Sequence, residues 1–144
     1  MENKQQFGFA IKRIKELAFN INQAEEISQD FEFGFGVLIN FDIEASSFEL
    51  QILTDLVNKE NKKSFVHITV SNVFYIEDLK KYVRSDGVTF DIPDMALISM
   101  LSISISHTRA LMAKNTLGTA YENYFIPIVN PTEMAKEIFK LNSN

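Results

Sequence analysis

The stretch MALISMLSISISHTRALMA, residues 95–113, decides the fold of this chain. It contains no acidic residue, and its apolar side chains are interleaved with serines up to His107 and Arg109. The alternation would also fit a strand, but a run of this length without a turn signal favours a helix of about 30 Å. A helix that is apolar or small on every side must be covered on more than one side. The sequence therefore predicts a long helix, from Asp94 to about Asn115, between its own sheet and a second protein surface.

The composition is that of one folded, water-soluble domain. The chain has 144 residues, of which 46% are apolar and 23% charged, so we expect a single domain over 1–144 with 1–8 as a flexible leader. A net charge of −5 argues against nucleic acid as a partner. The polar N-terminus is no signal peptide, and serines interrupt the best candidate for a membrane span, so we expect no direct membrane insertion and a cytoplasmic location.

Four segments before the long helix have the alternation of β-strands. In the clearest, Phe31 to Ile43, seven successive odd positions are apolar. The others run over Ile14–Ile21, with Leu17, Phe19 and Ile21 on one face, and over Phe48–Val57 and Ser64–Ile76. The short turns between the later strands favour antiparallel pairing.

The remaining segments complete an α+β fold. Residues 77–93 form a crossover loop in which Asp86-Gly87 is a turn. Gly118 follows the end of the long helix, where a left-handed cap is common, and Pro131 starts a short helix that ends at Phe139. We expect a four-stranded antiparallel sheet followed by a long helix and a short C-terminal helix.

No residue pattern indicates catalysis, a metal or a cofactor. His67 and His107 lie on different elements without a ligand at metal-binding spacing, so both are expected to be surface or hydrogen-bonded histidines. Ser106 and Thr108 point about 100° away from His107 on a helix and cannot form a nucleophile–base site with it. A hot-dog-type thioesterase is the enzyme alternative, although its central helix would come before most of the strands.

The order of several short motifs resembles the SecB family of export chaperones, over nearly the whole chain from Phe9 to Phe139. The motifs are Arg13-Ile14 running into Glu16-Leu17-Ala18-Phe19, Val73-Phe74-Tyr75-Ile76, Arg109, Gly118-Thr119 and Pro127-Ile128-Val129-Asn130.

The resemblance implies an ATP-independent holdase that keeps unfolded preproteins competent for export. It also implies a cytoplasmic homotetramer, a dimer of dimers with the long helices packed between sheets, and handover of clients to the SecA motor ATPase. For the oligomer interface it implies Leu97, Leu101, Ile105 and Met112.

The resemblance further implies a client-binding groove lined by aromatic side chains. The matching residues are Phe31, Phe33, Phe35, Phe74, Tyr75, Leu79, Tyr82, Phe90, Tyr121, Tyr124 and Phe125. The family docks SecA through acids on the exposed sheet face, and the corresponding positions are Glu16, Asn20 and His67. Because only one of these is acidic, a related chaperone dedicated to one partner, such as an antitoxin, is the alternative.

Overall fold

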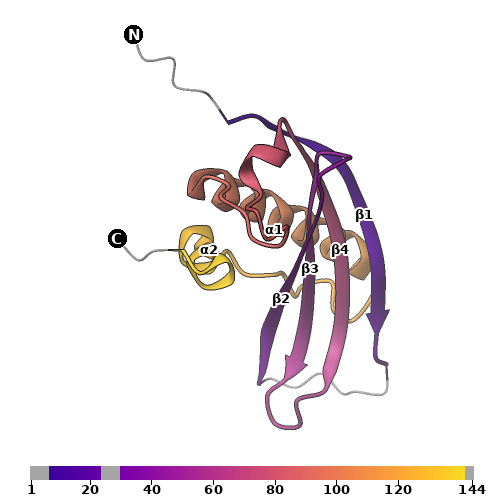
Figure 1. Ribbon diagram of the computed structural model, residues 1–144. Helices are drawn as coiled ribbons and strands as arrows, with labels where there is room; N and C mark the ends of the chain where they lie inside the picture. The colour runs from indigo at the N-terminus through magenta and orange to yellow at the C-terminus, as the bar shows by residue number, and fades with distance from the viewer. Residues whose placement is uncertain (1–6, 24–29, 142–144) are drawn as a thin grey trace.

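The computed structural model describes residues 7–23 and 30–141, which form one sheet with helices on one of its faces (Figure 1). Four antiparallel strands precede two α-helices, as the sequence predicts. The elements are β1 (Phe9–Ile21), β2 (Phe31–Asp42), β3 (Ser47–Asn58), β4 (Ser64–Ile76), the 3₁₀ helix η1 (Leu79–Tyr82), α1 (Asp94–Thr116) and α2 (Pro131–Phe139).

The strand order across the sheet is β1-β4-β3-β2, and every neighbouring pair is antiparallel. The strands β3 and β4 lie in the centre, and β1 and β2 form the two edges. We call the face that packs against α1 the inner face and the opposite face the outer face.

Alternation decides which side chains reach the inner face. Phe41, Phe48 and Phe74 lie in one row across β2, β3 and β4, and the even positions of β3 are buried while the odd ones are half-buried. A strand with one buried and one solvated face produces this pattern, so the predicted strands from Phe31 onward are confirmed to within one residue at each end.

Two bulges interrupt the alternation in β1. The pairing with β4 shifts between Ile11 and Arg13 and again between Glu16 and Ala18, so Lys12 and Leu17 are the extra residues. Each bulge reverses the face of the residues that follow it. Because of the second bulge, Leu17 does not share the inner face with Phe19 and Ile21, contrary to the prediction from the period-two pattern. The strand also begins earlier than predicted, at Phe9 and not at Ile14.

One side of α1 packs on the sheet, and its outward side carries Met95 and Ser106, both exposed. Polar side chains at the packed side are satisfied within the helix, since the hydroxyls of Ser104 and Thr108 donate to the carbonyls of Met100 and Ser104. The buried residues of α1 are Ala96, Leu97, Met100, Leu101, Ser104, Ile105, Thr108, Met112 and Thr116.

This packing corrects the expected oligomer interface. Leu97, Leu101, Ile105 and Met112 are all buried among the chain's own sheet and helix residues. Their spacings of four, four and seven residues bring them onto one side of α1, as in a core-facing stripe. These four side chains are therefore unavailable to a second subunit.

The ends of both helices follow the predicted signals. Gly118 has φ 77° just after α1, and the side chain of Asn130 accepts hydrogen bonds from the backbone N–H groups of Thr132 and Glu133 at the start of α2. By length and composition alone α1 could span a bilayer, and 44% of its most apolar window is buried inside the structure. A core helix has the same composition.

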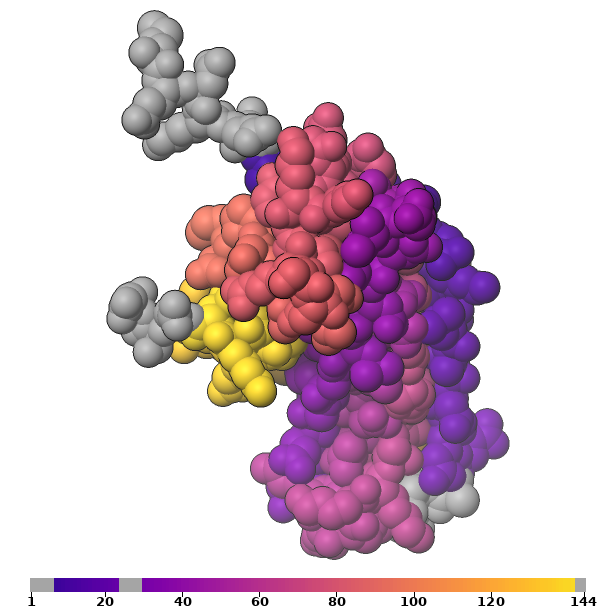
Figure 2. Space-filling view, in the orientation of Figure 1, coloured from indigo at the N-terminus to yellow at the C-terminus, as the bar shows by residue number. Residues whose placement is uncertain are grey.

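The crossover segment 77–93 is more ordered than a loop. It contains η1 and a bridge between Val83 and Phe90 that closes around the predicted turn at Asp86-Gly87. Hydrogen bonds from the backbone and side chain of Thr89 and from the backbone of Val88 lower the pKa of Asp86 to about 2. Figure 2 shows this segment and α2 side by side over part of the sheet, and the opposite end of the sheet extends beyond them.

The end of the expected leader, residues 1–8, packs against the folded domain. Residues 1–6 lie outside the described residues, but Phe7 packs against Tyr82 with ring centroids 5.0 Å apart. Phe7 therefore belongs to the folded domain.

Candidate binding surface

The side chains of the inner face form two apolar clusters. The crossover cluster lies under η1, α2 and the first half of α1, and contains Phe48, Phe74 and Leu79. The terminal cluster lies at the other end of the sheet and contains Leu56, Phe65 and Met112. Each cluster has partly buried aromatic side chains at its margin, and these are the candidates for binding.

The terminal cluster is bordered by an aromatic row on edge strand β2, formed by Phe31, Phe33 and Phe35. All three side chains are half-buried. Tyr124 packs edge-on against Phe31 with ring centroids 5.0 Å apart, and Tyr121 lies 6.3 Å from Tyr124. The structure thus brings together five of the residues predicted to bind clients, although Tyr121 itself is buried.

The connection between α1 and α2, residues 117–130, contacts this row through Tyr124 and exposes large apolar side chains. Phe125 is 58% exposed and Ile128 is 94% exposed. Arg109 holds the connection against α1, because its guanidinium donates to the carbonyls of Ile126 and Pro127, both at 2.9 Å. The role of Arg109 and the exposure of Ile128 were missed, because neither is visible in the sequence without the tertiary contact.

The remaining predicted groove residues lie elsewhere. Phe74 and Leu79 are buried in the crossover cluster, while Phe90 is half-buried against Phe48, with centroids 5.3 Å apart, and against Phe41 and Phe139. The row at Phe31 and the ring of Phe41 are separated by ten residues of β2, which is about 34 Å. The eleven predicted residues therefore do not line a single groove.

Tyr75 and the predicted docking residues divide between the two faces. Tyr75 lies on the outer face, one residue from buried Phe74. Asn20 and His67 are directly opposite each other on the outer face. The carboxylate of Glu16, by contrast, accepts a hydrogen bond from Asn115 of α1, because the bulge at Leu17 turns Glu16 to the inner face. The three do not form one docking face.

Both histidines are hydrogen-bonded, as expected. Nδ1 of His67 lies 2.9 Å from Oδ1 of Asp55, and its Nε2 lies 2.8 Å from Oγ1 of Thr69. On α1, Nδ1 of His107 lies 2.8 Å from Oδ1 of Asn72, and burial lowers the pKa of His107.

A carboxylate, an imidazole and a hydroxyl contact one another in the order of a catalytic triad: Asp55, His67 and Thr69. The hydroxyl of Thr69 is buried in the middle of the sheet, where neighbouring backbone groups are paired with β1 and β3. Such groups cannot also form an oxyanion hole. No group of three or more His, Cys, Asp or Glu side chains in the described part of the chain could hold a metal ion.

The arrangement of sheet and helices is the SecB-like fold. A SecB-like chaperone from Mycobacterium tuberculosis, Rv1957, solved with a ChAD peptide from the HigA1 antitoxin, matches with a TM-score of 0.52 and 12% identity. The match covers 85% of this chain and 90% of that one.

A protein of unknown function from Streptococcus agalactiae matches with a TM-score of 0.42 and 12% identity, over 87% of this chain and 99% of that one. No family model and no curated protein matches the sequence.

Proposed function

We propose that this protein is a chaperone that holds extended apolar segments of client proteins and needs neither ATP nor catalysis. One observation carries the proposal: the half-buried aromatic row of Phe31, Phe33 and Phe35 lies on an edge strand, and Tyr124, which packs on Phe31, directly precedes exposed Phe125. Apolar patches of this kind on a soluble domain mark interaction sites.

The open edge of β2 supplies the second half of the binding mode. Among residues 7–23 and 30–141 the strand pairs only with β3, on one side, so its other side presents backbone N–H and C=O groups to an extended segment. Backbone hydrogen bonds do not depend on the client's sequence, and burial against phenyl rings is non-directional. Together they suit a holdase that must accept many sequences.

Two client classes are compatible with this surface: exported preproteins passed to SecA, and a dedicated partner such as an antitoxin. The dedicated partner is favoured, because Glu16 lies on a different face from Asn20 and His67, so the three positions that correspond to the family's docking residues do not lie together. The antitoxin peptide bound by the structural neighbour agrees with this preference.

The proposal includes a homo-oligomer, a dimer of dimers, in the cytoplasm. The residues expected at its interface are buried, so other surfaces must serve. Ile11 and Ile14 are exposed on edge strand β1, and Met95 is exposed on the outward side of α1. A second copy that covers these side chains would remove apolar surface from water.

The test is binding of a labelled, extended apolar peptide, measured by fluorescence anisotropy without nucleotide. We expect Phe125→Ser combined with Phe33→Ser to weaken binding by about tenfold or more, since one buried phenyl ring contributes on the order of 2 kcal/mol. Val88→Ser combined with Tyr75→Ser removes two exposed side chains away from this surface, one on the crossover segment and one on the outer face, and serves as the matched control. Equal affinity of all three proteins would refute the assigned surface.

A second measurement separates the two client classes. Purified SecA and a purified antitoxin are each mixed with the protein and analysed by gel filtration. We expect a complex with an antitoxin-type client and none with SecA. Stable co-elution with SecA would reverse the preference.

A further inference from the structure

The outer face of β1 carries a basic strip made of Lys12, Arg13 and Lys15. A regular strand would place only alternate residues on one face, but the bulge at Lys12 lets Lys12 and Arg13 point the same way. Lys15 lies opposite Ser71, two positions further along the same face. The bulge therefore concentrates three positive charges at one edge of a chain whose net charge is −5.

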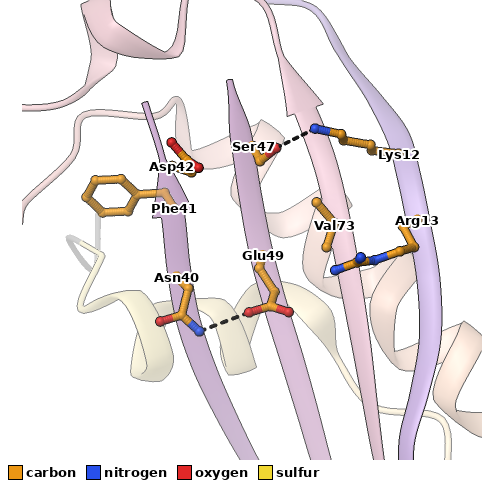
Figure 3. Close-up of a pocket in the computed structure, with 8 residues that line it drawn as sticks. All are labelled: Lys12, Arg13, Asn40, Phe41, Asp42, Ser47, Glu49 and Val73. Carbon is orange, nitrogen blue, oxygen red and sulfur yellow. Dashed lines mark hydrogen bonds between the residues drawn. The ribbon is translucent and has the colours of Figure 1, made fainter. Parts of the chain in front are cut away.

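Two of these side chains extend from β1 over the neighbouring strand β4 (Figure 3). Nζ of Lys12 donates to the hydroxyl of Ser47 at 2.9 Å, and Arg13, Val73 and Glu49 lie in one row across β1, β4 and β3. They border a hollow of about 420 Å³. Its lining residues are Lys12, Arg13, Asn40, Phe41, Asp42, Ser47, Glu49 and Val73.

Two acids line this hollow, and both already accept hydrogen bonds. The carboxylate of Asp42 accepts one from the backbone N–H of Ala45 at 3.2 Å. Glu49 accepts hydrogen bonds from Ser71, from Asn40 at 2.9 Å and from Gln51 at 3.1 Å. Burial raises the pKa of Glu49, and these hydrogen bonds with the charge of Arg13 bring it below its ordinary value. Glu49 is thus a fixed negative charge whose oxygens are bonded to other donors.

The cations, in contrast, have unused donors. Arg13 and Lys15 make no hydrogen bond or ion pair with another residue in the described part of the chain, and Lys12 uses one of its three N–H groups. Exposed guanidinium and ammonium groups next to a polar hollow form charge-assisted hydrogen bonds with carboxylates.

We propose that the basic strip docks an acidic segment of a partner protein. Arg13 and Lys15 are spaced as alternate residues of a strand, about 7 Å, which matches carboxylates at alternate positions of an extended segment. Glu32, Asp42, Glu49 and Asp55 occupy the same face on β2 and β3. A flat anionic membrane would meet all four acids together with the strip, whereas a narrow acidic segment along β1 stays clear of Glu32 and Asp55 and meets only the two acids of the hollow, whose carboxylates are already hydrogen-bonded.

The docking surface adds to the proposed function, because it lies on the face opposite the aromatic row. A client held on the inner face leaves the basic strip free, so one chaperone could bind a client and an acidic partner together. This partner is acidic, whereas a partner that docks on acids of the outer face would be basic.

The test uses a labelled eight-residue peptide in which glutamate alternates with serine, measured by anisotropy. We expect saturable binding that weakens with added salt. Lys12→Gln, Arg13→Gln and Lys15→Gln together should weaken it roughly tenfold, from three exposed ion pairs. The control combines Lys80→Gln, Lys114→Gln and Lys140→Gln, which are exposed cations elsewhere, and should bind like wild type.

Three outcomes would overturn the proposal: no binding of the peptide, an equal loss in both triple variants, or co-sedimentation with phosphatidylglycerol vesicles that the strip variant loses. If circular dichroism shows that the strip variant is unfolded, the single variant Lys15→Gln, with a weaker expected loss of two- to threefold, replaces it. Binding of the apolar client peptide should be unchanged in the strip variant, so failure here is distinguishable from failure of the proposed chaperone activity.

Discussion

Nδ1 of His107 in α1 lies 2.8 Å from Oδ1 of Asn72 at the centre of β4, at the boundary between the two apolar clusters of the inner face. The amide nitrogen of Asn72 donates to the carbonyls of Leu50 and Val70. Its oxygen is therefore the acceptor, and Nδ1 of His107 carries the proton. This buried polar contact fixes the position of α1 along the sheet, because a shift of one residue would leave Asn72 unsatisfied.

The contact predicts a pH dependence of stability. Burial lowers the pKa of His107 below its ordinary value of 6.5, so below that pH the unfolded chain binds a proton that the folded chain resists. The contribution of His107 to the free energy of unfolding is constant above pH 6.5, falls as the pH drops through 6.5, and levels off below the folded-state pKa.

Urea unfolding at about pH 7.5 and about pH 5.5 measures this dependence. His107→Gln keeps a side chain that can donate to Asn72 and does not titrate, so it should reduce the pH dependence. An unchanged dependence in His107→Gln would show that other groups cause it.

The faces of β4 predict unequal losses of stability from two adjacent substitutions. Phe74→Ala removes a fully buried ring and should lower the free energy of unfolding by about 3–5 kcal/mol. Tyr75→Ala lies on the outer face and should cost less than about 1 kcal/mol. Urea titration of both variants decides the matter, and a larger effect of Tyr75→Ala would invert the assigned faces.

The bulge at Leu17 predicts which residue of β1 can be cross-linked to α1. The chain contains no cysteine, so introduced pairs report on their own. Glu16→Cys with Asn115→Cys should cross-link with a short bifunctional maleimide, since the native side chains are hydrogen-bonded. Asn20→Cys with Asn115→Cys should not, because Asn20 lies on the outer face. The products are separated by mass, and cross-linking only in the second pair would exclude the bulge.

Two phenylalanines predict a separation of stability from binding. Phe90 contacts the rings of Phe41, Phe48 and Phe139, so Phe90→Ser should lower the free energy of unfolding by about 2–4 kcal/mol. Phe125 is exposed, so Phe125→Ser should leave unfolding unchanged within about 0.5 kcal/mol and weaken binding of an apolar peptide. Calorimetry and anisotropy on the same samples test both, and equal effects on stability would contradict the assignment.

The sequence predicts most elements because their patterns are local. Ser64–Ile76 and the start of the long helix at Asp94 agree with the structure to the residue. The N-terminal part of β1 was missed because the bulge at Lys12 breaks its alternation, and the bulge at Leu17 puts Glu16 and Asn20 on different faces. A bulge does not require a particular residue type, so the sequence of β1 contains no local signal for either bulge.

The candidate site was less predictable, because burial depends on which partner covers a side chain. The pattern that marks Phe31 and Phe74 as inward-facing is the same, yet a central strand under α1 buries Phe74 while the edge strand leaves Phe31 half-buried. The apolar stripe on α1 looks the same in the sequence whether a second subunit or the chain's own sheet lies opposite it. The four residues were therefore assigned to an oligomer interface although they belong to the core.

The most direct test of the central claim is light scattering of a chemically unfolded, aggregating client, diluted into buffer with or without this protein and without nucleotide. We expect suppression at near-stoichiometric ratios by wild type and weaker suppression by Phe125→Ser combined with Phe33→Ser, while Val88→Ser combined with Tyr75→Ser acts like wild type. Undiminished aggregation of several unfolded clients, including an antitoxin, at a large excess of folded protein would contradict the account.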